Sequence, residues 1–248
     1  MAYGVGEKIG IGRVLSNGFL LLRQNAVPFL ILGFVFYGFP GLAAAAVRGF
    51  PTATQQLQAS FGAAYFVPLL LTLVGSLVAL PAMLRFLGEK RAGETPELGG
   101  MLLEGLKLAP ATFAVLLLHL LASMVGWLFL LVPGIIIYIM FCVSLPVLTE
   151  ERAGVTGSLK RSRELTKGSR WRIFLLLLIG WLVLMVISAP IYAAVFLSPD
   201  SGVLNALISA AANTIFLPLS ATMLASLYFE LKDVREGAGT ETLAEIFA

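Results

Sequence analysis

Long stretches without a charged residue alternate with short charged segments along this chain. The uncharged stretches cover residues 24–47, 49–84, 108–149, 173–199 and 201–229. A charged side chain at the bilayer centre costs roughly 2.5–3.5 kcal/mol, and a helix needs about 20 residues to cross the hydrocarbon. Four stretches therefore have room for one crossing each, and residues 108–149 have room for two. The pattern predicts an all-α, multi-pass membrane protein with six transmembrane helices.

The segment Val132-Pro133-Gly134 divides the longest uncharged stretch, because proline and glycine break helices and form tight turns. We expect crossings at residues 26–47, 63–86, 108–131, 135–150, 173–197 and 204–229. The fourth is the shortest, so five crossings are the alternative if it is re-entrant.

The basic residues predict the orientation of the chain. With both termini in the cytoplasm, every Lys and Arg except Arg48 falls on the cytoplasmic side. This is the positive-inside bias of membrane proteins. It also favours two crossings within residues 108–149, since a single crossing would leave one basic cluster outside. Residues 1–10 contain no apolar stretch, so we expect no cleavable signal peptide and the first crossing to serve as the anchor.

A repeated unit is visible within what we expect to be a single membrane domain, residues 1–248. An amphipathic segment precedes the first, third and fifth crossings, and a Leu-Pro pair lies in each of the others, at Leu80-Pro81, Leu145-Pro146 and Leu217-Pro218. The pattern predicts three hairpins, each preceded by an amphipathic surface helix, in pseudo-repeats 9–87, 96–150 and 154–231. Chance recurrence of Leu-Pro in a leucine-rich chain is the alternative.

Composition excludes several classes of protein. The 248 residues are 58% hydrophobic and 12% charged, whereas soluble domains carry roughly a quarter charged residues. A soluble enzyme, a disordered chain, a collagen and a nucleic-acid binder are therefore excluded. Cys142 and His119 are single residues of their kind, which excludes a disulfide scaffold and metal sites rich in cysteine or histidine. We expect no metal and no cofactor. Enzyme motifs such as GxSxG and HExxH are absent, so we expect no catalytic activity.

The third amphipathic segment is strongly basic and leads directly into the fifth crossing. Basic helices of this kind lie among lipid headgroups, where each cation near an anionic leaflet is worth about 1 kcal/mol. The alternative is that the charges only enforce topology. Nucleic-acid binding is not expected, because one tryptophan at the edge of a crossing is no stacking platform. The predicted headgroup contacts are Lys160, Arg161, Arg163, Lys167, Arg170, Trp171 and Arg172.

Two polar features lie inside the predicted crossings. His119 is halfway along the third, where an ionisable group is a functional candidate, although a neutral histidine bonded across helices is the simpler interpretation. In the sixth, one narrow face carries Asn205, Ser209, Asn213 and Ser220. Such a face either packs against other helices or lines a pathway for a polar solute.

A resemblance to a known family is carried by one stretch of about 40 residues. The motifs are Pro133-Gly134, Leu145-Pro146, Glu150, Ser158-Leu159, Arg161-Ser162, Leu165-Thr166, Gly168 and Trp171-Arg172. The stretch resembles the membrane domain that accompanies some glycerophosphodiester phosphodiesterases, and is similar to YciC-type inner-membrane proteins of bacteria. The resemblance implies a six-helix protein of the bacterial inner (plasma) membrane. It carries no catalytic motif, so no phosphodiesterase activity follows from it.

The sequence thus predicts a non-enzymatic integral plasma-membrane protein. Its basic amphipathic helices are expected to engage the anionic cytoplasmic leaflet, in a lipid-binding or partner-scaffolding role. Small residues that end the first crossing allow close contact with a protein partner or a second copy of the chain. A small transporter or channel that uses the polar face of the sixth crossing is the alternative.

Overall fold

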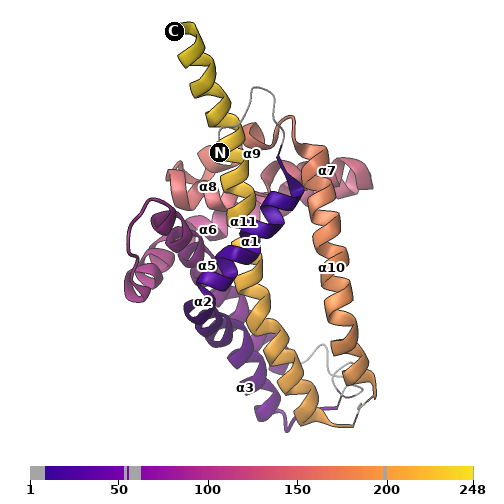
Figure 1. The fold of residues 1–248 in the computed structure, drawn as a ribbon. Helices are drawn as coiled ribbons and strands as arrows, with labels where there is room; N and C mark the ends of the chain where they lie inside the picture. Colours follow the sequence, from indigo (N-terminus) through magenta and orange to yellow (C-terminus); the bar gives the residue numbers. More distant parts are fainter. Residues whose placement is uncertain (1–8, 53–54, 56–62, 198–199, 248) are drawn as a thin grey trace.

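The computed structural model describes residues 9–52, 55, 63–197 and 200–247, and this described part consists of helices joined by turns, without a strand (Figure 1). The helices are α1 (Ile11–Gln24), α2 (Ala26–Gly33), the π-helix η1 (Phe34–Gly38), α3 (Phe39–Val47), α5 (Ala63–Arg91), α6 (Leu98–Phe129), α7 (Leu131–Phe141), α8 (Ser144–Glu151), α9 (Gly154–Thr166), α10 (Arg170–Leu197) and α11 (Gly202–Phe247).

Within the described residues, six segments are long and apolar enough to cross a membrane. They are Ala26–Val47, Phe66–Arg91, Gly99–Phe129, Leu131–Glu151, Arg170–Pro190 and Gly202–Glu236. The first combines α2, η1 and α3, and the fourth combines α7 and α8, which are separated at Cys142-Val143. Six apolar segments indicate an integral, multi-pass membrane protein, in agreement with the prediction from the charge pattern.

The turn between the third and fourth crossings differs from the prediction. The chain reverses at Leu130, which has an extended backbone (φ −176°, ψ 159°), and α7 already includes Val132, Pro133 and Gly134. The first turn of a helix has no internal partners for its N–H groups, so a proline there loses no hydrogen bond. Pro133 therefore fits into the first turn of α7 without interrupting the helix. Helices α6 and α7 approach closely beside this turn, where a β-carbon on Gly126 would lie 2.8 Å from Gly134 Cα.

The amphipathic segments also differ from the predicted pattern. Helices α1 and α9 are separate elements, but the second segment is continuous with its crossing in α6. Nothing between Leu98 and Pro110 breaks that helix, and membrane helices accommodate an internal proline. Both separate helices pack on the bundle. On α1, the carbonyl of Val14 accepts a hydrogen bond from Ser226 Oγ of α11 at 2.8 Å.

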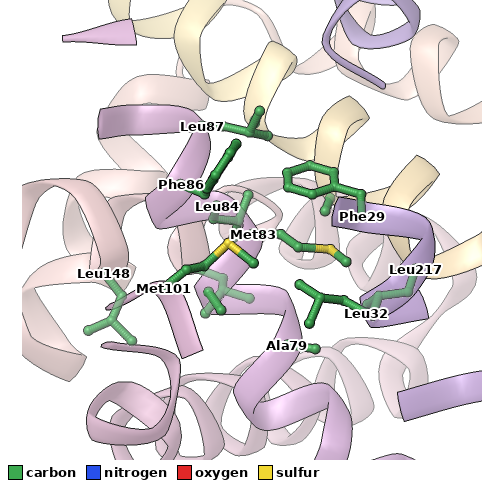
Figure 2. Packing of buried hydrophobic residues seen from close by; sticks show 14 of the residues in the cluster. Phe29, Leu32, Ala79, Met83, Leu84, Phe86, Leu87, Met101, Leu148 and Leu217 are labelled. Atoms are coloured by element: carbon green, nitrogen blue, oxygen red, sulfur yellow. The ribbon is translucent and has the colours of Figure 1, made fainter. Parts of the chain in front are cut away.

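The largest buried cluster joins α2, α5, α6, α8 and α11 (Figure 2). At its centre the rings of Phe29 and Phe86 meet edge to face, with centroids 5.5 Å apart. A second cluster joins α1, α7, α8, α9, α10 and α11 around Tyr228. Helix α10 contributes Ile173 and Leu176 to it, whereas Val186 further along α10 is 73% exposed. Exposed apolar surface of this kind suits contact with lipid.

The two ends of the molecule differ in chemistry. Helices α8 and α9 lie at one end, and the end of α3 and the start of α11 lie at the other (Figure 1). At the α3 end, the carbonyl of Phe50 packs directly against Gly202. Ion pairs among the described residues connect α1, α5, α6, α8, α9, α11 and Arg152, so charge is concentrated at the α8–α9 end.

Candidate functional site: the charged end of the helix bundle

The basic cluster of α9 and α10 is divided into inward and outward side chains. Arg161 Nε donates a hydrogen bond to Glu151 Oε2 at 3.0 Å, and Arg172 Nη1 donates to the carbonyl of Ile9 at 2.7 Å. Arg170 is half-buried. The outward side chains are exposed and form what we call the exposed basic face: Lys160, Arg163, Lys167 and Trp171.

The packing of α9 explains this division. Ser158, Ser162 and Leu165 are buried on one side of the helix, and Ser162 Oγ donates to the carbonyl of Met140 in α7 at 2.8 Å. At 3.6 residues per turn, Lys160 lies on the opposite side. The charged side of α9 therefore faces away from the bundle.

Trp171 extends the exposed basic face to the start of a membrane-spanning helix. Its side chain is 70% exposed and stacks on Phe174, with ring centroids 5.3 Å apart. Tryptophan is enriched at the boundary between hydrocarbon and water, because its ring is apolar and its N–H is polar. The exposed basic face thus combines cations with an aromatic residue suited to the headgroup region.

The inward arginine belongs to an internal network. Arg161 Nη2 donates to Glu236 Oε1 at 2.6 Å, while Tyr228 Oη donates to Glu151 Oε1 at 3.0 Å. Burial alone would lower the pKa of Arg161, but the neighbouring Glu151 carboxylate raises it, and the pKa lies above its ordinary value. Arg161 is therefore a charged structural side chain that holds α8, α9 and α11 together.

Further contacts bring α1 and α5 to the same stretch of α11. Arg91 Nη2 pairs with Asp233 Oδ1 at 2.6 Å, and Arg13 Nε pairs with Glu230 Oε1 at 2.9 Å. Since Arg161 contacts Glu236, the segments around Arg91 and Arg161 lie at one end of the bundle. The location of both segments on the cytoplasmic side of the membrane stays a prediction from the charge pattern.

Glu150 is a half-buried acidic residue that was not among the predicted site residues. Its carboxylate packs directly against Gly88 of α5, and Glu150 Oε1 is buried without a hydrogen-bond partner among the described residues. In the sequence, the feature that could have indicated Glu150 is its position as an acidic residue at the end of the predicted fourth crossing. Tyr228, also unpredicted, gave no signal, because a tyrosine near the end of a membrane helix is ordinary.

The predicted intramembrane polar residues do not form one site. His119 is half-buried against α7, with its ring centroid 5.1 Å from that of Tyr138 and 6.1 Å from that of Phe141. On α11, Asn205 is 4% exposed, Ser209 and Asn213 are exposed, and Ser220 is half-buried and donates to the carbonyl of Leu217 at 2.8 Å. The polar face of α11 is therefore not enclosed along its length.

No group of three or more His, Cys, Asp or Glu side chains in the described part of the chain is arranged to hold a metal ion. The charged carboxylates at the α8–α9 end are instead engaged with arginines, as at Glu151, Glu230 and Asp233.

Comparison with known families gives a match over most of the chain. Residues 11–231 match the model of a domain of unknown function (DUF7847). The chain belongs to this family. The DUF7847 match covers the exposed basic face, Glu150, Glu151 and Tyr228, and ends before Asp233 and Glu236. It does not link the chain to the membrane domain of glycerophosphodiester phosphodiesterases or to YciC-type proteins. No curated protein and no solved structure matches the chain.

Proposed function

We propose that this DUF7847 protein is a non-enzymatic, multi-pass protein of the bacterial inner membrane that binds anionic lipid headgroups through its exposed basic face. In this proposal both termini and the α8–α9 end lie in the cytoplasm, where the positive-inside bias places them. The predicted resemblance to YciC-type inner-membrane proteins agrees with this location. Scaffolding of a protein partner is compatible with the same surface.

The observation that carries the proposal is the contrast between neighbouring cations. Arg161 and Arg172 are used by the protein itself, whereas Lys160, Arg163 and Lys167 are exposed and have no ion-pair partner among the described residues. Three cations near an anionic leaflet are worth about 3 kcal/mol together, or roughly 100-fold in affinity. Because they are exposed, their effect should weaken as salt increases.

Transport along α11 is not proposed. The sequence supported transport through a continuous polar face on this helix. In the structure, Asn205 is buried while Ser209 and Asn213 lie on the surface. These side chains do not line one enclosed path.

The test removes the three cations and counts bound lipid. The full chain is placed in nanodiscs of equal parts phosphatidylglycerol and phosphatidylcholine, released, and analysed by native mass spectrometry. The variant Lys160→Gln/Arg163→Gln/Lys167→Gln should lose the preference for phosphatidylglycerol that the parent shows.

A matched control removes the same charge elsewhere at the same end. Arg23, Lys107 and Arg152 are also exposed, so Arg23→Gln/Lys107→Gln/Arg152→Gln changes net charge equally. This control should keep most of the preference. Equal loss in both triple variants, or no loss in the first, would refute the proposal.

A further inference from the structure

A pocket lined by charges of both signs lies at the α8–α9 end of the molecule. It lies between α6, α8 and the start of α9 and has a volume of about 400 Å³, within the ~300–1,000 Å³ typical of ligand pockets. One part of its lining is charged and the other is apolar. The charged residues are Glu104, Lys107 and Arg152, and the apolar ones are Leu108, Ala111 and Leu148.

The charged side chains of the pocket are accessible and only loosely paired. Glu104 Oε1 accepts a hydrogen bond from Lys107 Nζ at 2.9 Å, and Glu104 Oε2 lies 3.5 Å from Arg152 Nη2. The side chains of Lys107 and Arg152 are 71% and 65% exposed. Ion pairs this exposed contribute little to stability, so a ligand that carries both charges exchanges with them at low cost.

The backbone of Arg152 is unusual for an arginine. It ends α8 in the left-handed conformation, with φ 49° and ψ 32°. Glycine or asparagine ordinarily takes this position, because a β-carbon is strained there. In this conformation the guanidinium lies beside Glu104 of α6, which is 48 residues away in the sequence. A contact made by the side chain explains an arginine here better than the stability of the helix end does.

The apolar part of the pocket extends toward the hydrocarbon. Leu108 begins the uncharged stretch of the third crossing, and Ala111 lies one turn further along α6. The seven residue steps from Glu104 to Ala111 span roughly 10 Å, whereas the headgroup layer of one leaflet is about 5–8 Å deep. Leu148 also belongs to the buried cluster in Figure 2, so the packed core forms part of the pocket floor.

We propose that this pocket binds a phospholipid whose headgroup carries a primary ammonium, as phosphatidylethanolamine does. The phosphate lies between Arg152 and Lys107, the ammonium lies on Glu104, and the start of an acyl chain lies on the apolar residues. A guanidinium binds phosphate through paired hydrogen bonds. A primary ammonium donates three hydrogen bonds to a carboxylate, whereas the methylated ammonium of phosphatidylcholine has no N–H to donate.

This site shares no residue with the exposed basic face, so the two proposals are tested separately. Lys107 and Arg152 contact a phosphate that phosphatidylglycerol and phosphatidylcholine both carry. Removing them in the control variant above therefore does not abolish the preference between those two lipids.

The experiment uses photo-crosslinking of the full chain in phosphatidylcholine vesicles. The probe is a phosphatidylethanolamine or a phosphatidylcholine with the same diazirine near the glycerol end of one acyl chain, and labelled peptides are located by mass spectrometry. Labelling around Leu128, which is 84% exposed near the other end of α6, measures contact with bulk lipid. Relative to it, phosphatidylethanolamine should label residues 108–111 about fivefold more than phosphatidylcholine, because it hydrogen-bonds to a charged group. Equal relative labelling would overturn the proposal.

Two glutamates of the same helix provide a matched pair of variants. Glu104 lines the pocket, whereas Glu97 is exposed at the start of α6 and does not line it. Glu104→Gln should remove the preference for phosphatidylethanolamine, and Glu97→Gln removes the same charge and should keep it. Loss of the preference in both variants, or in neither, would overturn the site.

The variant Arg152→Gly separates lipid binding from stability. Glycine relieves the left-handed backbone, so the unfolding midpoint should stay the same or rise. Labelling of residues 108–111 by both probes should fall about fivefold, the effect of one cation beside a phosphate. Unchanged labelling, or a fall accompanied by a lower midpoint, would overturn the role of Arg152.

Free glycerophosphoethanolamine distinguishes a lipid from a soluble ligand. It carries the same charged groups but no acyl chains, so it leaves the apolar part of the pocket empty. At millimolar concentration it should not reduce labelling by the phosphatidylethanolamine probe. Competition would indicate a site for a soluble molecule and overturn the assignment to a lipid.

Discussion

The carboxylate of Glu150 lies in the space that a β-carbon on Gly88 would occupy. This contact joins α8 to α5 at the charged end of the bundle. Glycine at this position lets the half-buried Glu150 side chain approach the backbone of a neighbouring helix.

We expect Gly88→Ala to destabilise the protein. The added methyl group must displace the carboxylate of Glu150, which is the far end of a flexible, half-buried side chain, so we expect a cost of about 1 kcal/mol, at the low end of overpacking. Thermal unfolding in detergent should show a lower midpoint. Gly100→Ala is the control, because a β-carbon there meets nothing within 4 Å, and it should be neutral or stabilising by up to about 1 kcal/mol. Equal midpoints for both variants would contradict the prediction.

A second glycine contact stabilises the first crossing. Pro218 of α11 has no N–H, so the carbonyl of Thr214 receives no helical hydrogen bond from it, and Gly33 packs directly over that carbonyl. Gly33→Ala should therefore cost about 1–3 kcal/mol, because a methyl group would separate α2 from α11. Gly41→Ala in the same crossing has open space around it and should not lower the unfolding temperature. A stable Gly33→Ala protein would show that this contact is unimportant.

Adjacent cations on α9 should have opposite roles. Arg161→Gln removes the hydrogen bonds to Glu151 and Glu236 and should cost about 1–3 kcal/mol of stability. Since the pKa of Arg161 is raised, its charge and its contribution persist at neutral pH and would be lost only as pH rises beyond that pKa. Lys160→Gln should leave the unfolding midpoint unchanged and weaken binding of phosphatidylglycerol. The reverse assignment, with Lys160→Gln destabilising and Arg161→Gln weakening lipid binding, would be incompatible with the structure.

The threading through the membrane can be tested with single cysteines. In a Cys142→Ala background, Ala92→Cys and Thr156→Cys, both at exposed positions, should react with an impermeant maleimide from the same side. Asp200→Cys, also exposed, should react only from the other side. Labelling of Ala92→Cys and Thr156→Cys from opposite sides would refute the predicted orientation and the proposed binding of cytoplasmic lipid headgroups.

The number of apolar segments followed from the sequence, because an unbroken uncharged stretch is a local property of the chain. The details of the turns did not. Pro133 and Gly134 suggest a turn in isolation, yet the chain reverses at Leu130 and Pro133 lies in the first turn of α7. A proline is compatible with both a turn and a first helical turn, so the packing of α6 against α7 decides between them.

At the candidate site, too, the sequence predicted the composition but not which side chains are exposed. The sequence placed seven residues in one basic cluster, but only Lys160, Arg163, Lys167 and Trp171 are exposed. Arg161 turns inward because Glu151 of the preceding helix and Glu236, which is 75 residues away, meet it there. The position of Glu150 likewise depends on its contact with Gly88, in a distant segment of the chain.

The sequence by itself determined that this is a helical membrane protein with six apolar segments, since charge and hydropathy act residue by residue against the bilayer. Only the tertiary structure decided which cations are internal and which are exposed. That choice depends on which face of each helix is covered, and the covering side chains come from other parts of the chain.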